Sequence, residues 1–281
     1  ILASGRACPR PSCPLEALEC SMGGQRGGVS SVWHECHGVQ GDDNILVSVG
    51  PGNQRWLTLR QFPGFVQSTL RCEGKAPASP VRGRCDDPAV VAALHCKRAV
   101  SARERSIPVY EKLFGALLPL CGARRELQPG RRILMLGLGG GTLQTVLAEA
   151  CPGTQVTTVE QNPHVISVAR DYFGFTGDVV LNDAQHALDD LSKQGRQYDA
   201  VVVDITDSRL GRADTKHLAQ VLRPSGLVLE NWTPRPEAGP RLREHREDLR
   251  NFFVDIKESS DGTGSNTVLS ASAADTTPII S

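Results

Sequence analysis

Apolar residues in the second half of the chain occur in short runs, separated by turns and by longer stretches with helical character. The runs 133–136, 179–181 and 200–203 are wholly apolar, and 155–159 is rich in β-branched residues. Runs of this length are typical of strands buried in a sheet. The intervening stretches 143–150 and 184–192 have the length and composition of helices. This alternation predicts an α/β fold around a parallel sheet.

The pattern continues to the end of the chain. We predict a helix at 216–222, a strand at 223–230, a loop at 231–240, a helix at 241–253 and strands at 253–257 and 265–271. The last residues form a tail.

The first hundred residues have a different pattern. Residues 1–31 are rich in Gly, Pro, Ser and Cys and predict an irregular arm. Strands are predicted at 32–40, 45–49, 55–59 and 65–70, with the second and third forming a hairpin, followed by a loop at 73–88 and a short helix at 89–93. A longer helix is predicted at 109–120, because Val109, Leu113, Leu117 and Leu120 share one face.

A glycine-rich turn, GLGGGTL at 137–143, follows the strand 133–136 and precedes a helix. This order is typical of a nucleotide-binding α/β unit, in which glycines let the backbone approach a ligand closely. Glu160 ends the next strand, where a carboxylate can accept hydrogen bonds from both ribose hydroxyls. The alternative is a surface glutamate at a strand end. No Gly-Lys-Ser/Thr follows, so phosphate binding is not required, and the residues alone leave NAD open.

Four segments carry a more specific resemblance: GLGGGTL (137–143), VEQNPHVISVARDYFGF (159–175), LNDAQHAL (181–188) and YDAVVVDITD (198–207). They resemble the spermidine-synthase-like branch of class I S-adenosylmethionine-dependent methyltransferases, close to the spermidine-synthase-like domain of eukaryotic elongation-factor methyltransferases. The resemblance implies a Rossmann-like seven-stranded sheet with an antiparallel last strand, behind a small cysteine-rich N-terminal β part. We expect that N-terminal region at 1–100, the catalytic domain at 101–275 and a tail at 276–281.

The resemblance also implies a site for S-adenosylmethionine or its decarboxylated form. The expected cofactor-binding residues are Gly137, Leu138, Gly139, Gly141, Glu160, Gln161, Asp183, Ala184 and Asp204, and the expected catalytic residues are Asp204 and Asp207. Asp183 would accept from the amine of adenine, beside the Ala184 N–H; alternatively it only caps helix 184–192. Asp204 would take a proton from the attacking amine; alternatively it caps the next turn.

Three departures from the aminopropyltransferase pattern shift the expected reaction. Gly140 stands where those enzymes have an Asp that holds the amino end of the cofactor. Tyr110-Glu111 replaces a Tyr-His pair, and the segment 208–215 is a short acceptor cover that suits a peptide terminus or a side chain. We therefore favour a methyltransferase acting on an amine or protein acceptor. An aminopropyltransferase and a non-catalytic binding protein are the alternatives.

Composition restricts the partners. The 281 residues carry 31 Lys+Arg and 31 Asp+Glu. This balance does not favour a nucleic-acid partner, and no apolar run approaches the length of a membrane span. The chain starts at Ile1 rather than Met, so we expect that an upstream segment was removed or not included. A homodimer through the N-terminal β part is implied by the resemblance alone.

Cysteines are concentrated near the start of the chain. Seven of nine lie in the first hundred residues: Cys8, Cys13, Cys20, Cys36, Cys72, Cys85 and Cys96. This favours disulfides and a secreted or lumenal location over the cytoplasm. The odd total leaves at least one thiol free or paired between chains. Asn231-Trp-Thr fits the glycosylation pattern. No C-x2-C pair suggests zinc, and we interpret 34–37 (HECH) as a solvated loop rather than a metal site.

Overall fold

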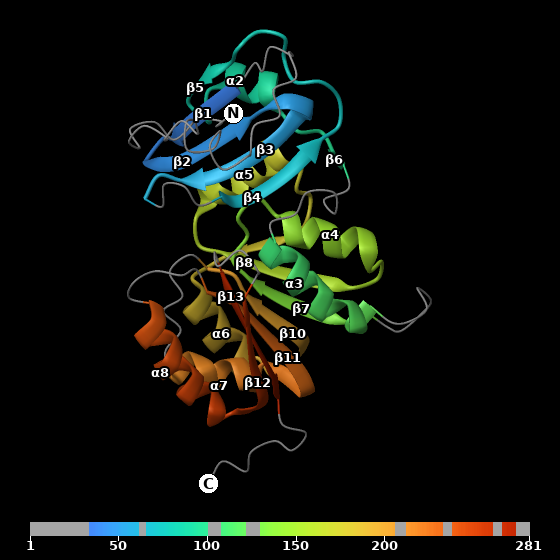
Figure 1. Ribbon diagram of the computed structural model, residues 1–281, viewed down its shortest axis with the longest axis vertical. Helices are drawn as coiled ribbons and strands as arrows, with labels where there is room; N and C mark the ends of the chain where they lie inside the picture. The colour runs from blue at the N-terminus through green and yellow to red at the C-terminus, as the bar shows by residue number, and fades with distance from the viewer. Residues whose placement is uncertain are drawn as a thin grey trace, which may run out of the picture.

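The computed structural model describes residues 34–61, 66–100, 108–121, 130–205, 212–232, 238–260 and 266–273. These residues form two sheets, shown in Figure 1. A six-stranded sheet has the order β5-β1-β2-β3-β4-β6, and a seven-stranded sheet has the order β12-β13-β11-β10-β7-β8-β9.

The N-terminal sheet is an antiparallel meander of β1 (His34–Val39), β2 (Asp42–Val49), β3 (Gln54–Leu59) and β4 (Val66–Cys72). The short strands β5 (Arg82–Gly83) and β6 (Ala99–Val100) extend its edges, and helix α2 (Pro88–Leu94) lies between them in the chain. The predicted hairpin is confirmed, since Val47 of β2 lies opposite Leu57 of β3. The strand predicted at 32–40 is confirmed over 34–39 as β1, so the interpretation of 34–37 as a solvated loop is wrong; Cys36 is buried and makes a disulfide.

The second sheet has the predicted α/β topology. Strands β7 (Arg132–Leu136), β8 (Gln155–Glu160), β9 (Val179–Leu181), β10 (Tyr198–Val203) and β11 (Leu222–Trp232) are parallel. Strand β13 (Thr267–Ala273) lies antiparallel between β11 and β12 (Phe253–Ser260). The expected antiparallel last strand is therefore confirmed.

Helices cover both faces of this sheet (Figure 1). On one face lie α3 (Pro108–Leu117), the 3-10 turn η3 (Leu118–Cys121) and α4 (Thr142–Ala150). On the other lie α6 (Ala184–Lys193), α7 (Arg212–Gln220) and α8 (Ala238–Arg250). None of the described helices is both long and apolar enough to cross a bilayer.

Several predicted boundaries near the C-terminus are wrong. Helix α7 begins at Arg212, before the predicted 216, and Leu222 already belongs to β11. The predicted loop 231–240 starts too early, because Asn231 and Trp232 continue the β11 ladder opposite β13. Helix α8 begins at Ala238 and ends at Arg250, where the pattern predicts 241 and 253. The end of β11 is decided by pairing with a strand more than 30 residues away, which a local pattern does not contain.

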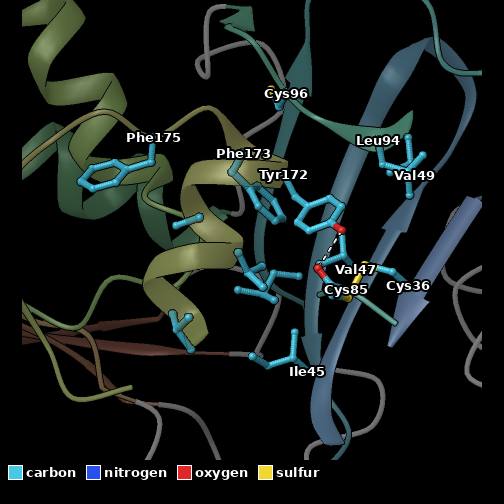
Figure 2. Close-up of a cluster of buried hydrophobic side chains, with 14 of the residues drawn as sticks. Cys36, Ile45, Val47, Val49, Cys85, Leu94, Cys96, Tyr172, Phe173 and Phe175 are labelled. Carbon is cyan, nitrogen blue, oxygen red and sulfur yellow. Dashed lines mark hydrogen bonds between the residues drawn. A yellow bond between two sulfur atoms is a disulfide. The ribbon is translucent and has the colours of Figure 1, made fainter. Parts of the chain in front are cut away.

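Helix α5 (Pro163–Phe173) lies between the two sheets and contacts β2 and β4 of one and β8 of the other. Its N-cap Asn162 accepts from the His164 N–H, and its C-cap Gly174 has a φ of 64°. Tyr172 and Phe173 are fully buried in a core shared with the N-terminal strands, as Figure 2 shows. The Tyr172 hydroxyl donates to the Cys85 carbonyl at 2.9 Å. The first sheet is therefore packed onto a helix of the second unit.

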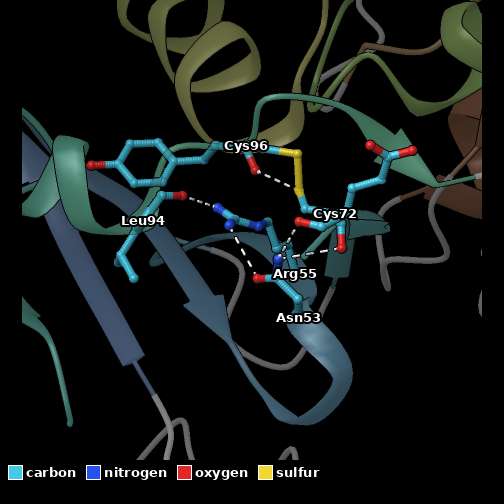
Figure 3. The surroundings of a disulfide bond; sticks show 7 residues. Asn53, Arg55, Cys72, Leu94 and Cys96 are labelled. Atoms are coloured by element: carbon cyan, nitrogen blue, oxygen red, sulfur yellow. Dashed lines mark hydrogen bonds between the residues drawn. A yellow bond between two sulfur atoms is a disulfide. The ribbon is translucent and has the colours of Figure 1, made fainter. Parts of the chain in front are cut away.

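Three disulfides lie among the described residues: Cys36–Cys85, Cys72–Cys96 and Cys121–Cys151. The first two tie strands of the N-terminal sheet to the segment around α2, and Figure 3 shows the second. The third joins η3 to the end of α4. The expected disulfides are confirmed; Cys8, Cys13 and Cys20 lie outside the described residues.

Candidate functional site

A cavity of about 510 Å³ lies at the carboxyl ends of β7, β8 and β10. Eight of the predicted cofactor residues line it: Gly137, Leu138, Gly139, Glu160, Gln161, Asp183, Ala184 and Asp204. The N-terminal sheet closes the opposite side with Asp42, Asn44, Leu57, Leu59, Gln61 and Gln67, and α3 adds Tyr110. Ligands of open α/β sheets bind at this end of the strands, so the position agrees with the sequence prediction.

The glycine turn brings the β7 backbone against β10. Gly137 has a φ of 102°, and a Cβ there would lie 2.1 Å from the Asp204 carbonyl oxygen. A side chain at 137 would therefore push the two strand ends apart. Gly141 does not line the cavity. It is the N-cap of α4 and packs against the Phe175 ring, away from the cavity. The expected contact between Gly141 and the cofactor therefore stays a prediction.

Glu160 is held by backbone donors. Its Oε2 accepts from the Leu138 N–H at 3.1 Å and its Oε1 from the Asn162 N–H at 2.9 Å. Burial raises the pKa of Glu160, although these hydrogen bonds oppose the shift. A carboxylate has about four acceptor positions, so each oxygen retains capacity for a ribose hydroxyl. The predicted strand-end carboxylate is therefore in the cavity and fixed in orientation.

Asp183 caps α6 and also lines the cavity. Its Oδ1 caps α6 by accepting from the Gln185 and His186 N–H groups, at 2.9 and 3.2 Å. The residue also lines the cavity beside Ala184. Its Oδ2 makes none of the hydrogen bonds found among the described residues, which leaves an acceptor for an exocyclic amine.

Gly140 is enclosed by residues from elsewhere in the chain. Its N–H donates to Ser68 Oγ at 2.8 Å. A Cβ at 140 would lie 2.8 Å from the Ser68 Cβ and 2.9 Å from the Phe173 ring. An aspartate therefore has no room at this position, and the departure from the aminopropyltransferase pattern is enforced by packing.

Asp204 follows β10 and lies among hydrogen-bond donors. Asn231 Nδ2 donates to its Oδ1 at 2.8 Å. The Tyr110 hydroxyl donates to the Gln67 carbonyl at 2.8 Å and is also within hydrogen-bonding reach of Asp204. Burial raises the pKa of Asp204, and the hydrogen bonds from Asn231 and Tyr110 oppose that rise. Burial also raises the pKa of Tyr110 well above its usual value.

Asn231 was assigned from the sequence to a loop and a glycosylation pattern. Its amide nitrogen instead donates to Asp204, so the atom that a glycan needs is engaged inside the site. Asp207 and the short cover at 208–211 lie outside the described residues. The first aspartate of the YDAVVVDITD run, Asp199, lies at the far end of β10, where it pairs with Arg131 and Arg223 and has no role in the cavity.

Comparisons with known proteins give a partial match in sequence and a match in fold. No family model matches the chain. The eEF1A lysine and N-terminal methyltransferase of Danio rerio is 33% identical over 123 residues, which cover 38% of this chain and 18% of the relative. The chain thus spans only a small part of the curated relatives that it matches first.

Two solved structures share the fold. Human methyltransferase-like protein 13, in complex with SAH, superposes with a TM-score of 0.53 at 20% identity, covering 62% of this chain and 84% of that one. A probable spermidine synthase from Corynebacterium glutamicum gives 0.53 at 14% identity, covering 81% and 76%. The expected fold and the resemblance to the spermidine-synthase-like branch are confirmed.

Proposed function

We propose that this protein is an S-adenosylmethionine-dependent methyltransferase whose acceptor is an amine of a protein. The observation that carries the choice of reaction is Gly140, whose side-chain direction is filled by Ser68 and Phe173. A carboxylate that could hold the ammonium of the decarboxylated cofactor has no place there. The relative from Danio rerio, named for methylating a lysine and an N-terminus, supports a protein acceptor.

The cavity residues fit the cofactor. Glu160 is oriented for the two ribose hydroxyls, while Asp183 and the Ala184 N–H match the acceptor–donor edge of adenine. When bound, S-adenosylmethionine supplies an electrophilic methyl group. The chain orients the cofactor through Glu160, Asp183 and Ala184, and it places the Asp204 carboxylate beside the acceptor amine.

Asp204 is the general base in this proposal. A protonated amine has no lone pair for attack, so a carboxylate must accept its proton. A carboxylate with a raised pKa is a stronger base, and burial raises the pKa of Asp204. Asn231 and Tyr110 orient it. Asp207 stays a prediction as a second catalytic residue.

The test is calorimetric titration with S-adenosylmethionine, its decarboxylated form and methylthioadenosine, followed by transfer of a labelled methyl group to peptides with a free N-terminus or a lysine. We expect at least tenfold preference for S-adenosylmethionine. Preference for the decarboxylated form would instead support aminopropyl transfer, and binding of none of the three would support a non-catalytic protein. Asp204→Asn is the control, which should bind the cofactor and transfer label about 10²–10⁴-fold more slowly.

The remaining predictions concern the location, the domain limits and the oligomeric state of the protein. We propose a secreted or lumenal location, because the three disulfides persist best in an oxidising compartment. Mass spectrometry of alkylated protein from cells tests this, and reduced Cys36 and Cys85 would contradict it. The domain limits 1–100, 101–275 and 276–281 and the homodimer stay predictions, for which limited proteolysis and sedimentation are the measurements.

A further inference from the structure

We propose that Ser68 is a positioning residue of the site, tying the glycine turn to the Tyr110 hydroxyl beside Asp204. This inference rests on the proposed function and goes beyond it. It gives the N-terminal sheet a part in the reaction geometry, in addition to forming a wall of the cavity.

The first contact is with the turn. Ser68 lies in β4 and is fully buried, and its Oγ accepts from the Gly140 N–H at 2.8 Å. The same Oγ lies 2.8 Å from the position that a Cβ of Gly139 would take. A residue 72 positions earlier in the chain therefore fixes the backbone of the turn. Without it, a buried N–H would be left without a partner.

The second contact is with Tyr110. The phenol hydroxyl lies near both Ser68 and Asp204: a Cβ on Gly139 would be 2.8 Å from Ser68 Oγ and 4.0 Å from the Tyr110 oxygen. It donates to the Gln67 carbonyl at 2.8 Å. A hydroxyl has one proton. Because Ser68 Oγ accepts from Gly140, its own proton is available to the Tyr110 oxygen. Tyr110 must then direct its proton to the Gln67 carbonyl or to Asp204, both of which only accept.

These contacts form a chain from the Gly140 N–H through Ser68 to the Tyr110 hydroxyl, which donates to the Gln67 carbonyl and lies beside Asp204. Among the described residues, the groups that face Asp204 are the Tyr110 hydroxyl from α3 and the Asn231 amide from β11. Hydrogen bonds in a chain strengthen one another. Removing Ser68 should therefore loosen the turn and displace the Tyr110 hydroxyl beside Asp204 together.

The test uses Ser68→Ala, Tyr110→Phe and the double variant. Ser48→Ala is the matched control, since Ser48 is 1% exposed and lies in the same sheet on β2. Two readouts need no cofactor: exchange of the Gly140 amide and titration of the Asp204 carboxyl, both by NMR. We expect Ser68→Ala to speed Gly140 exchange at least tenfold. We expect the Asp204 pKa to rise in Tyr110→Phe and, less, in Ser68→Ala.

Two readouts then use the cofactor. Ser68→Ala should weaken S-adenosylmethionine binding about tenfold, while Tyr110→Phe should change binding little and move the acid limb of the pH–rate profile upward. The double variant should shift that limb by less than the sum of the single shifts. Unchanged Gly140 exchange, or strictly additive shifts in the Asp204 titration, overturns the inference. Failure of the wild type to transfer methyl would overturn the proposed function alone, because the NMR readouts do not depend on it.

Discussion

The two sheets are stabilised in different ways. In the seven-stranded sheet, Leu134, Met135, Val201 and Val202 are all at most 1% exposed, and helices cover both faces. In the N-terminal sheet, buried polar side chains lie among the apolar ones, and two disulfides hold its ends. The seven-stranded sheet is buried on two faces by helices, whereas in the N-terminal sheet disulfides and buried hydrogen bonds supplement the apolar core.

Arg55 illustrates the difference (Figure 3). It is 2% exposed and donates to the Leu94 carbonyl and to Asn53 Oδ1. Burial lowers the pKa of Arg55 to about 10. Asn53 in turn donates to the Cys72 and Glu73 carbonyls. These buried hydrogen bonds join β3, the end of β4 and the end of α2, so they add directional contacts to the apolar core of the N-terminal sheet.

The largest expected effect is on the rate of methyl transfer, and it tests whether Asp204, at the end of β10 in the seven-stranded sheet, is the base. Asp204→Asn should lower the rate of methyl transfer by about 10²–10⁴, because the amine loses its base. Thermal stability should not fall, since the substitution removes a carboxylate whose ionised form burial disfavours. Rates under saturating cofactor and a thermal melt measure both quantities. A rate within tenfold of the wild type would remove Asp204 from the mechanism.

The disulfides give the most direct test of the two modes of stabilisation. Replacing Cys72 and Cys96 by Ser opens a loop with a sequence separation of 24 and should cost about 3–4 kcal/mol of unfolding free energy. Denaturant unfolding measures this, and a reductant, which opens all three disulfides, should destabilise the wild type by at least as much.

Leu134→Ala is the counterpart in the second sheet. It removes a fully buried side chain and should cost about 2–5 kcal/mol. The difference from the wild type should be the same with and without reductant. A cost that disappears on reduction would show that the two sheets do not behave differently.

Glu160→Gln tests whether the cavity requires two acceptor oxygens at position 160. Both carboxylate oxygens accept from backbone N–H groups, so the glutamine NH₂ must face one donor with another. We expect a loss of about 1–3 kcal/mol in stability, together with loss of nucleoside binding. Calorimetry and thermal melts check this. Retained affinity for methylthioadenosine would contradict the assigned contact with ribose.

The smallest effect is a pH dependence at His245, on α8. Burial alone would lower the pKa of His245, but the hydrogen bond and charge of Glu230, then the charges of Asp248 and Asp214, raise it above 6.5. The stabilisation is therefore complete below pH 6.5 and is lost as the pH rises through the folded-state pKa. Unfolding free energy measured against pH should show this loss in the wild type and not in His245→Asn.

Much of the parallel sheet could be predicted because its information is local. The runs 133–136 and 200–203 mark buried strands, and each is followed at the strand end by a residue that lines the cavity. Glu160 and Asp204 could be placed at the cavity in this way, whereas Asp183 was indicated by the family resemblance. The antiparallel order of the last strand came from the family resemblance.

The contacts that complete the site could not be predicted, because they join distant positions. Ser68 meets Gly140 across 72 residues, and Asn231 meets Asp204 across 27. Tyr110 was noted only as a departure from a motif. No local pattern indicates that Ser68 and Phe173 enclose Gly140 or that α5 packs against both sheets. The pairing of the cysteines is equally absent from any local pattern. The one available signal was that Asn231 follows closely after the apolar run 227–229.

The Cys121–Cys151 disulfide has a mechanical consequence. It joins the far ends of α3 and α4, whose near ends carry Tyr110 and the glycine turn. The disulfide therefore prevents α3 and α4 from sliding along each other. A small rotation of one helix about the disulfide changes the distance between the Tyr110 hydroxyl and the glycine turn, so this distance depends on the angle between the two helices.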